Sequence, residues 1–249
     1  MKQPTRILAT LLLISTIFTS GFSQRKGGFL NSIIKKATGD TSTSATGAGL
    51  SNTDIVSGLK AALSTGTEAS VNKLSSVNGF LKDAAVKILL PPEAQKVEKT
   101  LRSLGMGSLV DNAITSLNRS AEDASKKAAP IFLSAIKNMS ITDALGILRG
   151  GDTSATTYLR KSTTTELSSA FRPVIDSSLA KTGATKYWAS LFNAYNKVSL
   201  TKVNPDLSNY VTEKAMSGIF HYVGQEEKNI RKDPASYASS IIKTVFGSK

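Results

Sequence analysis

The sequence predicts an all-α protein, a compact bundle of about nine or ten helices with kinks at prolines, preceded by a signal peptide and a flexible tether. From residue 54 onward, apolar residues recur every three or four positions in successive stretches, which is typical of amphipathic helices. Glycine and proline residues separate these stretches, as they do at helix ends and starts. No stretch shows the alternating pattern of a half-buried strand. We therefore expect residues 52–249 to form a single all-helical domain.

Residues 1–24 have the three-part pattern of a secretory signal peptide. Lys2 and Arg6 precede an apolar stretch that is too short to be a stable membrane anchor, and small or polar residues follow it. We expect cleavage between Ser23 and Arg25 and a periplasmic location, with an uncleaved anchor helix as the alternative. The chain has no cysteine, so it is not expected to be a lipoprotein or to contain disulfides. No later segment is long and apolar enough to predict a transmembrane helix.

Residues 25–51 are expected to form a flexible tether. Its second half, from Ala37 to Ser51, is rich in glycine, serine and threonine. Its first half has apolar and basic residues at helical spacing, which could lie on an anionic membrane surface as a peripheral contact. These residues are Phe29, Leu30, Ile33, Ile34, Lys35 and Lys36. Docking on the folded domain is the slightly favoured alternative, because an isolated helix of about nine residues is marginal in water.

The chain is strongly basic, with a formal net charge of +13. Removal of Lys2 and Arg6 with the signal peptide leaves 29 basic against 18 acidic residues. Such an excess attracts anions, among them phospholipid headgroups, lipopolysaccharide and polyanionic glycans. Export makes nucleic acid an unlikely partner, and a basic surface without a dedicated partner is the alternative.

The first predicted helix begins near Asn52 or Thr53 and ends at Asn78-Gly79. An apolar connection over residues 80–90 should be buried, and a helix starting at Pro91-Pro92-Glu93 should end at Gly105 or Gly107. The remaining helices are expected over 108–129, over 131–139 after an interruption by Pro130, over 141–149, over 155–161, over 165–181 with a bend at Pro173, over 186–198, from Asp206 onward, and from Asp233-Pro234 onward.

The densest polar stretch is the joint between two of these helices, residues 140–160. Ser140 with Asp143 forms a capping pattern that predicts a helix start at Ile141. Gly150 and the glycine after it should end this helix, because glycine tolerates the left-handed conformation. Asp152 then stands where the next helix needs an N-cap. We refer to this stretch as the polar joint.

A second polar group lies within one turn of the helix over residues 108–129, where an arginine and a glutamate three positions apart can form an ion pair. In the functional interpretation this group converges with the polar joint into one ligand-binding pocket. A structural network that satisfies buried polar groups is the favoured alternative. The candidate residues are Asn118, Arg119, Glu122, Asp143, Arg149, Asp152, Tyr158 and Arg160.

Four separated stretches resemble the bacterial domain of unknown function 4197 (DUF4197) family. They are Asp54–Leu63, Leu117–Glu122, Asp143–Asp152 and Ala155–Tyr158, and the resemblance extends over roughly Leu50 to Phe246. Ser120 departs from the alanine of the family pattern. The resemblance implies an exported bacterial protein of all-helical build. It implies no reaction, because the family has no established activity.

Other chemical signatures are weak or missing. Carboxylates in the first turns of helices are usually caps, so an acid–base pair among Glu122, Asp143 and Asp152 is disfavoured. His221 is the single histidine and cannot anchor a histidine-rich metal site. Trp188 and the aromatic residues that follow it have the spacing of a helix core rather than of a carbohydrate platform. No nucleotide, serine hydrolase or zinc-protease motif is present, so we expect no cofactor, no metal and no catalytic residues.

Two hypotheses follow for the function. The first is an exported envelope protein without enzymatic activity, a helical module that binds an anionic envelope component or another protein. The second is a small-ligand-binding protein or an enzyme, in which Arg149 and Arg160 hold an anion and Asp152 or Glu122 acts as a base. The missing catalytic signatures favour the first hypothesis.

Overall fold

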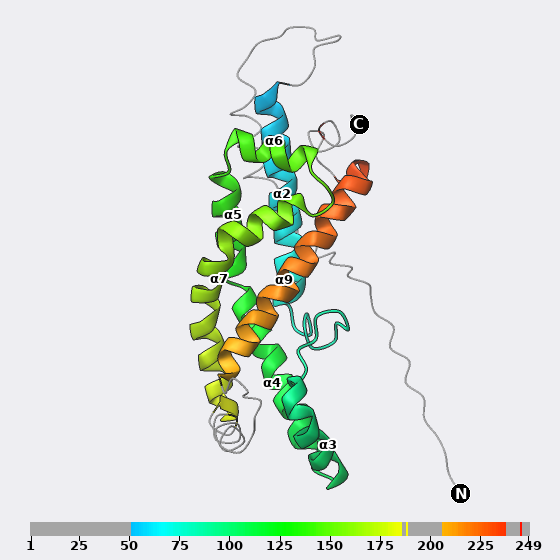
Figure 1. The fold of residues 1–249 in the computed structure, drawn as a ribbon, viewed down its shortest axis with the longest axis vertical. Helices are drawn as coiled ribbons and strands as arrows, with labels where there is room; N and C mark the ends of the chain where they lie inside the picture. Colours follow the sequence, from blue (N-terminus) through cyan, green and yellow to red (C-terminus); the bar gives the residue numbers. More distant parts are fainter. Residues whose placement is uncertain (1–50, 186–187, 189–205, 238–244, 246–249) are drawn as a thin grey trace, which may run out of the picture. The chain divides into compact units, whose positions relative to one another are not determined.

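The computed structural model describes residues 51–185, 188, 206–237 and 245 (Figure 1). The chain divides into two units, Met1–Ala48 and Gly49–Lys249. The first unit, with the expected signal peptide and most of the tether, lies outside the described residues, as does nearly all of the helix expected over 186–198.

The described part of the second unit contains helices and turns but no strand, which confirms the all-α prediction. The α-helices are α2 (Asn52–Ser75), α3 (Gln95–Ser103), α4 (Gly107–Ser125), α5 (Ala128–Lys137), α6 (Ile141–Arg149), α7 (Ser154–Lys181) and α9 (Leu207–Lys232). Two 3₁₀ helices, η1 (Pro92–Ala94) and η2 (Pro234–Ser236), precede α3 and follow α9.

The prediction of nine or ten helices was wrong for the described part of the chain, which has fewer. One reason is that the helices expected over 155–161 and 165–181 form the single helix α7. The polar residues between them lie within the helix, and their hydroxyls donate to carbonyls one turn earlier. Thr163 Oγ1 lies 2.6 Å from the Leu159 oxygen, and Thr164 Oγ1 lies 2.6 Å from the Arg160 oxygen.

The prolines act differently from one another. Pro130 is the third residue of α5, where a helix does not need its N–H, so it lies at a helix start rather than interrupting a longer helix. The break falls earlier, between Ser125 and Ala128. Pro173 lies inside α7, which continues through it.

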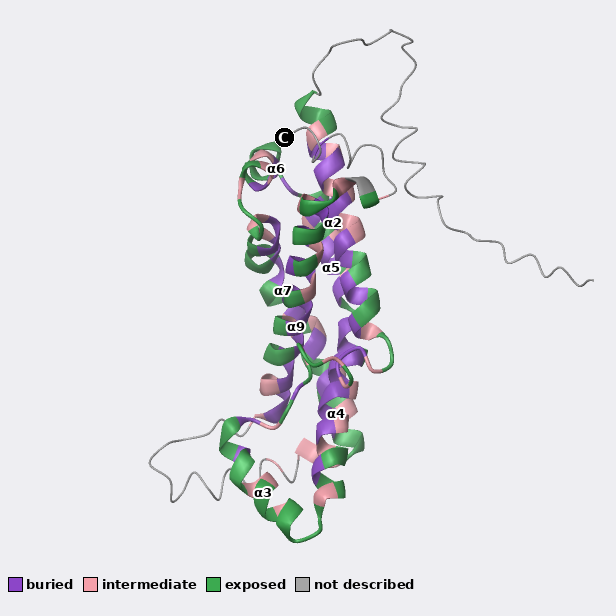
Figure 2. Ribbon diagram, turned by 90° about the vertical axis from the view of Figure 1, so that its right-hand side faces the viewer, coloured by how far each residue is buried: buried purple, intermediate pink, exposed green. Residues whose placement is uncertain are grey.

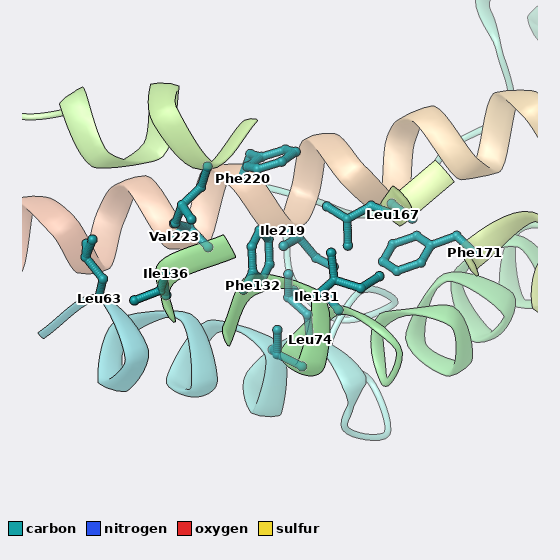
Figure 3. Packing of buried hydrophobic residues seen from close by; sticks show 14 of the residues in the cluster. Leu63, Leu74, Ile131, Phe132, Ile136, Leu167, Phe171, Ile219, Phe220 and Val223 are labelled. Atoms are coloured by element: carbon teal, nitrogen blue, oxygen red, sulfur yellow. The ribbon is translucent and has the colours of Figure 1, made fainter. Parts of the chain in front are cut away.

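Helices α2, α4, α5, α7 and α9 pack around one hydrophobic core (Figure 2). α7 packs against α9, α4 and α5, while α2 packs against α9, α5 and α6. At the centre, the rings of Phe132 and Phe220 meet edge to face with centroids 5.8 Å apart (Figure 3). Phe220 also carries the Arg160 guanidinium 4.3 Å from its ring centroid.

The connection between α2 and η1 closes one side of this core. Asn78, with a positive φ of 72°, turns the chain after α2, and Phe80 is fully buried. Phe80 reaches α9 because residue 218 is glycine, where a Cβ would lie 2.6 Å from the Phe80 ring. The connection was expected to be buried throughout, but Leu89 is exposed.

No single helix of the described residues is long and apolar enough to cross a membrane. One bent pair, Gly107–Lys137 with Ile141–Arg149, meets that criterion jointly by length and composition.

Candidate functional site

The polar joint begins with the predicted cap. The Asp143 N–H donates to Ser140 Oγ at 3.1 Å, and the Ser140 N–H donates back to Asp143 Oδ2 at 3.3 Å. This is a capping box, and it places the first helical residue at Ile141 as predicted.

The end of α6 differs from the prediction. α6 ends at Arg149, but Gly150 has φ −79° and ψ 179°, so it does not use the left-handed conformation. Glycine is needed there for space, because a Cβ on residue 150 would lie 2.1 Å from Ser154 Oγ and 2.7 Å from Ser154 Cβ. Residue 150 must therefore be glycine because α6 and α7 approach each other closely there, and not because its backbone is left-handed.

Asp152 is not the N-cap of α7. The capping position belongs to Thr153, whose side chain accepts no capping hydrogen bond. The first amides of α7 instead donate to Glu227, a buried residue of α9. The Ala155 N–H lies 2.9 Å from Glu227 Oε1, and the Thr156 N–H lies 2.8 Å from Glu227 Oε2. A carboxylate suits this position because the N-terminus of a helix carries partial positive charge.

Arg231, one turn further along α9, completes this arrangement. Its Nη2 lies 2.9 Å from Glu227 Oε1 and 2.8 Å from the Ile147 oxygen near the C-terminus of α6. Together the two side chains join the end of α6 to the start of α7, and we call them the α9 clamp. The sequence does indicate that Glu227 is buried, because it falls within the apolar stripe formed by Ile219, Val223 and Ile230, but this spacing does not identify its partners.

The charged residues predicted for the polar joint lie on its surface. Arg149, Asp152 and Arg160 are exposed, and Arg160 stacks on Phe220 as described above. Tyr158 is partly buried, and burial together with the charge of Asp143 raises its pKa. Within the described residues, no hydrogen bond or ion pair joins Arg149 to Asp152.

The second predicted polar group binds a different part of the chain. Glu122 Oε1 accepts from the N–H groups of Phe80 and Leu81, both at 3.1 Å. Asn118 accepts from the Ile88 N–H and donates to the Ile88 oxygen, both at 2.8 Å. We call this group on α4, with its ion-paired neighbour described next, the α4 latch, because it holds the connection between α2 and η1.

The ion pair expected between Arg119 and Glu122 is confirmed, with Nη1 to Oε2 at 2.6 Å. Arg119 Nη2 also donates to Asn78 Oδ1 at 2.9 Å, at the turn after α2. Across the described part of the chain, no hydrogen bond or ion pair links this latch to Arg149, Asp152 or Arg160. The eight candidate residues therefore form two separate groups rather than one polar pocket.

The cavity beside the α9 clamp is very small. It measures about 10 Å³ and is lined mainly by Leu59, Ala62, Leu63 and Ile230 with the clamp residues. That volume holds about one water molecule at most. The buried part of the polar joint thus offers no room for an organic ligand.

Comparison with protein-family models identifies the family of the chain. Residues 49–247 match the family described as protein of unknown function (DUF4197). The chain belongs to this family. The match covers the whole of the described structure and confirms the resemblance seen in the separated sequence stretches. The comparisons with curated proteins and with solved structures gave no match.

This DUF4197 chain has a third polar cluster, which the sequence analysis missed. Asp83 of the connection accepts a hydrogen bond from the Tyr222 hydroxyl of α9 and pairs with Lys73 Nζ of α2 at 3.3 Å. Lys73 also lies 3.7 Å from the Tyr222 ring centroid. Burial favours the neutral form of Asp83, but the hydrogen bonds from Tyr222, the Ala85 N–H and Lys73 prevail and lower its pKa.

These clusters show what the polar side chains of the DUF4197 domain do in the structure. Among the described residues the buried carboxylates are Glu122 and Glu227, and each accepts hydrogen bonds from main-chain N–H groups and from an arginine, so each has a structural use. Among the described residues, no three metal-ligating side chains gather at one point. An open groove of about 440 Å³ lies between α4 and α7, lined by Asp123, Pro173, Val174, Ser177, Ser178 and Lys181.

Proposed function

We propose that this protein is an exported bacterial envelope protein that acts as a non-enzymatic helical module for an anionic envelope surface. The observation that carries the proposal is the way in which charge is divided along the chain. A second function, binding of a small ligand at the polar joint, has less support, because the cavity there measures only about 10 Å³.

The described residues are almost balanced in charge, with 20 basic and 17 acidic residues. The rest of the chain has 11 basic residues and a single acidic one, Asp40. Two of these 11, Lys2 and Arg6, belong to the predicted signal peptide. In the mature protein the basic excess therefore belongs mainly to segments before, between and after the described helices.

This division favours a surface partner over a buried ligand. A basic segment next to a folded helical body attracts a polyanionic surface at long range, and salt weakens that attraction. The segment before α2 combines Arg25, Lys26, Lys35 and Lys36 with apolar neighbours, a composition suited to anionic headgroups. The proposed periplasmic location would bring it near such headgroups.

Export is tested by intact-mass measurement of the protein from a periplasmic extract. We expect the mass of a chain that begins between Ser23 and Arg25. A full-length chain that stays in the membrane fraction would contradict the periplasmic assignment.

Binding is tested by sedimentation of the mature chain with vesicles of phosphatidylglycerol or phosphatidylcholine. We expect binding to the anionic vesicles only, weakening as salt is raised. The variant Lys35→Gln/Lys36→Gln should bind less. The matched control is Lys126→Gln/Lys127→Gln, which removes two adjacent exposed lysines from the turn between α4 and α5 and should have the smaller effect. Salt-independent binding, or none to either vesicle, would contradict the proposal.

A further inference from the structure

We infer that the hairpin formed by α3 and α4 inserts its apolar tip into the headgroup region of an anionic phospholipid bilayer. This inference rests on the proposed function. It adds a second membrane contact, made by a folded part of the protein, to the contact made by the basic segments. The hairpin tip is residues 103–109, which join the two helices.

Within the hairpin, α3 differs in burial from the other described α-helices. α3 contains no buried residue, and its main helix neighbour is α4. At the tip, Leu104 is 68% exposed, Met106 is 42% exposed and Leu109 is 53% exposed. Figure 2 shows α3 as mostly exposed, next to an α4 that becomes buried further along the chain. Three neighbouring apolar side chains are thus left in water without a partner in the described residues.

The tip also carries no charge, since its sequence is Ser103-Leu-Gly-Met-Gly-Ser-Leu109. Gly105, with φ 76°, makes the tight turn that brings these side chains to one end. A segment that enters a bilayer must not take unpaired charges with it, because their desolvation is costly. The composition of the tip meets that condition.

The nearest charged side chain, Arg102, lies beside Gly107 of the tip and is paired with carboxylates. Arg102 of α3 bonds to Glu98 Oε1 at 2.9 Å and to Asp111 Oδ1 of α4 at 2.8 Å. The bond to Asp111 connects the two helices, and the single guanidinium offsets part of the charge of the two carboxylates beside the apolar end. Lys96 and Lys99 remain exposed on α3, and no ion pair to them exists within the described residues. The hairpin over residues 95–111 thus has three basic and two acidic residues, with two lysines available for lipid phosphates.

The size of the tip favours lipid over protein as the partner. A stable protein interface buries about 800 Å² on each side, which three partly exposed side chains do not supply. Membrane association needs less, because a single weak anchor becomes effective when a polybasic segment supplies a second attachment. The tip and the basic segments meet that requirement together.

The experiment uses the absence of cysteine from the chain. Met106→Cys in the mature protein is labelled with an environment-sensitive fluorophore and mixed with phosphatidylglycerol vesicles. We expect a blue shift and quenching by spin-labelled lipids. Ser177→Cys, at an exposed position of α7, is the control and should show neither. Leu104→Ser/Leu109→Ser should weaken vesicle binding at least about tenfold, while Val77→Ser, which removes an exposed apolar residue elsewhere, should not.

The outcomes separate the two proposals. If the protein sediments with anionic vesicles while the label at residue 106 stays in water, the inference is wrong and the proposed function stands. If the protein binds no vesicle, the proposed function fails, and the inference fails with it. If the serine variant loses vesicle binding while its circular dichroism is unchanged, lipid insertion by the tip is supported. If a crosslinker attached at residue 106 captures a protein, while Leu104→Ser/Leu109→Ser leaves vesicle binding intact, the tip belongs to a protein partner and the inference is overturned.

Discussion

The α4 latch and the α9 clamp both bind main-chain N–H groups of a distant segment through a buried glutamate paired with an arginine. In each, a buried glutamate accepts two consecutive main-chain N–H groups from a distant part of the chain, and an arginine on the same helix neutralises it. Glu122 binds a turn, whereas Glu227 binds the start of a helix. The two sites differ in how far the arginine is removed from water.

Arg119 of the latch has a side chain that is 37% exposed, whereas Arg231 of the clamp is only 8% exposed. Arg119 also donates to a single side chain, while Arg231 bonds to main-chain oxygens at the end of α6. A buried ion pair costs most when one partner is removed, because the other charge remains without solvent. The clamp should therefore tolerate substitution less well than the latch.

The largest effect is expected from Glu227→Ala. It leaves Arg231 as a buried charge without its carboxylate and removes the partner of two α7 amides, so we expect a loss of about 3–5 kcal/mol in the free energy of unfolding. Urea unfolding followed by circular dichroism measures it. Lys228→Ala, at the exposed neighbouring position, is the control and should change the free energy by less than about 0.5 kcal/mol. A loss below about 1 kcal/mol would show that the clamp contributes little to the stability of the fold.

Glu122→Ala should have an intermediate effect. The amides of Phe80 and Leu81 lose their acceptor, but Arg119 can be hydrated once it is freed, so we expect a loss of about 2–3 kcal/mol. The same unfolding experiment applies, with the exposed Asp123→Ala as the matched control. If Glu122→Ala costs as much as Glu227→Ala, exposure of the arginine does not decide the difference between the two sites.

Smaller losses of stability distinguish the observed helix cap, Ser140, from the expected one, Asp152. Ser140→Ala removes a hydroxyl of the capping box and should cost about 1 kcal/mol. Asp152→Ala removes an exposed carboxylate that makes no capping hydrogen bond to the described helices, so the free energy of unfolding should change by less than about 0.5 kcal/mol. Both are read from thermal unfolding. A larger cost for Asp152→Ala than for Ser140→Ala would mean that Asp152 supports the start of α7 after all.

Local rules predicted the parts of the fold that depend on neighbours in sequence. The helical pattern, the capping box at Ser140 and the ion pair of Arg119 all involve residues within four positions, so spacing alone identifies them. The α9 clamp joins Glu227 to Ala155 and Thr156 across more than 70 positions. No local pattern predicts that contact, and so Asp152 was assigned the capping role. The division of the candidate residues into two groups has the same cause, since tertiary packing decides it.

The smallest effect concerns Asp83, a third carboxylate that is more open than the two glutamates. Its hydrogen bonds lower its pKa, so it stabilises the fold above its unfolded pKa of about 3.8, and that stabilisation is lost as the pH falls through its folded pKa. Tyr222→Phe removes one of these bonds and should raise the pKa of Asp83. Wild type should therefore be more stable than Tyr222→Phe at pH 6, by less than about 1 kcal/mol, and this difference should shrink below about pH 3.8.

NMR titration of the Asp83 carboxyl measures its pKa, and His221→Ala, an exposed neighbour of Tyr222, is the control. An unchanged pKa of Asp83 in Tyr222→Phe would show that Lys73 and the Ala85 N–H alone hold this carboxylate. In that case the three carboxylates would share one rule, which is that main-chain N–H groups and a basic side chain are enough.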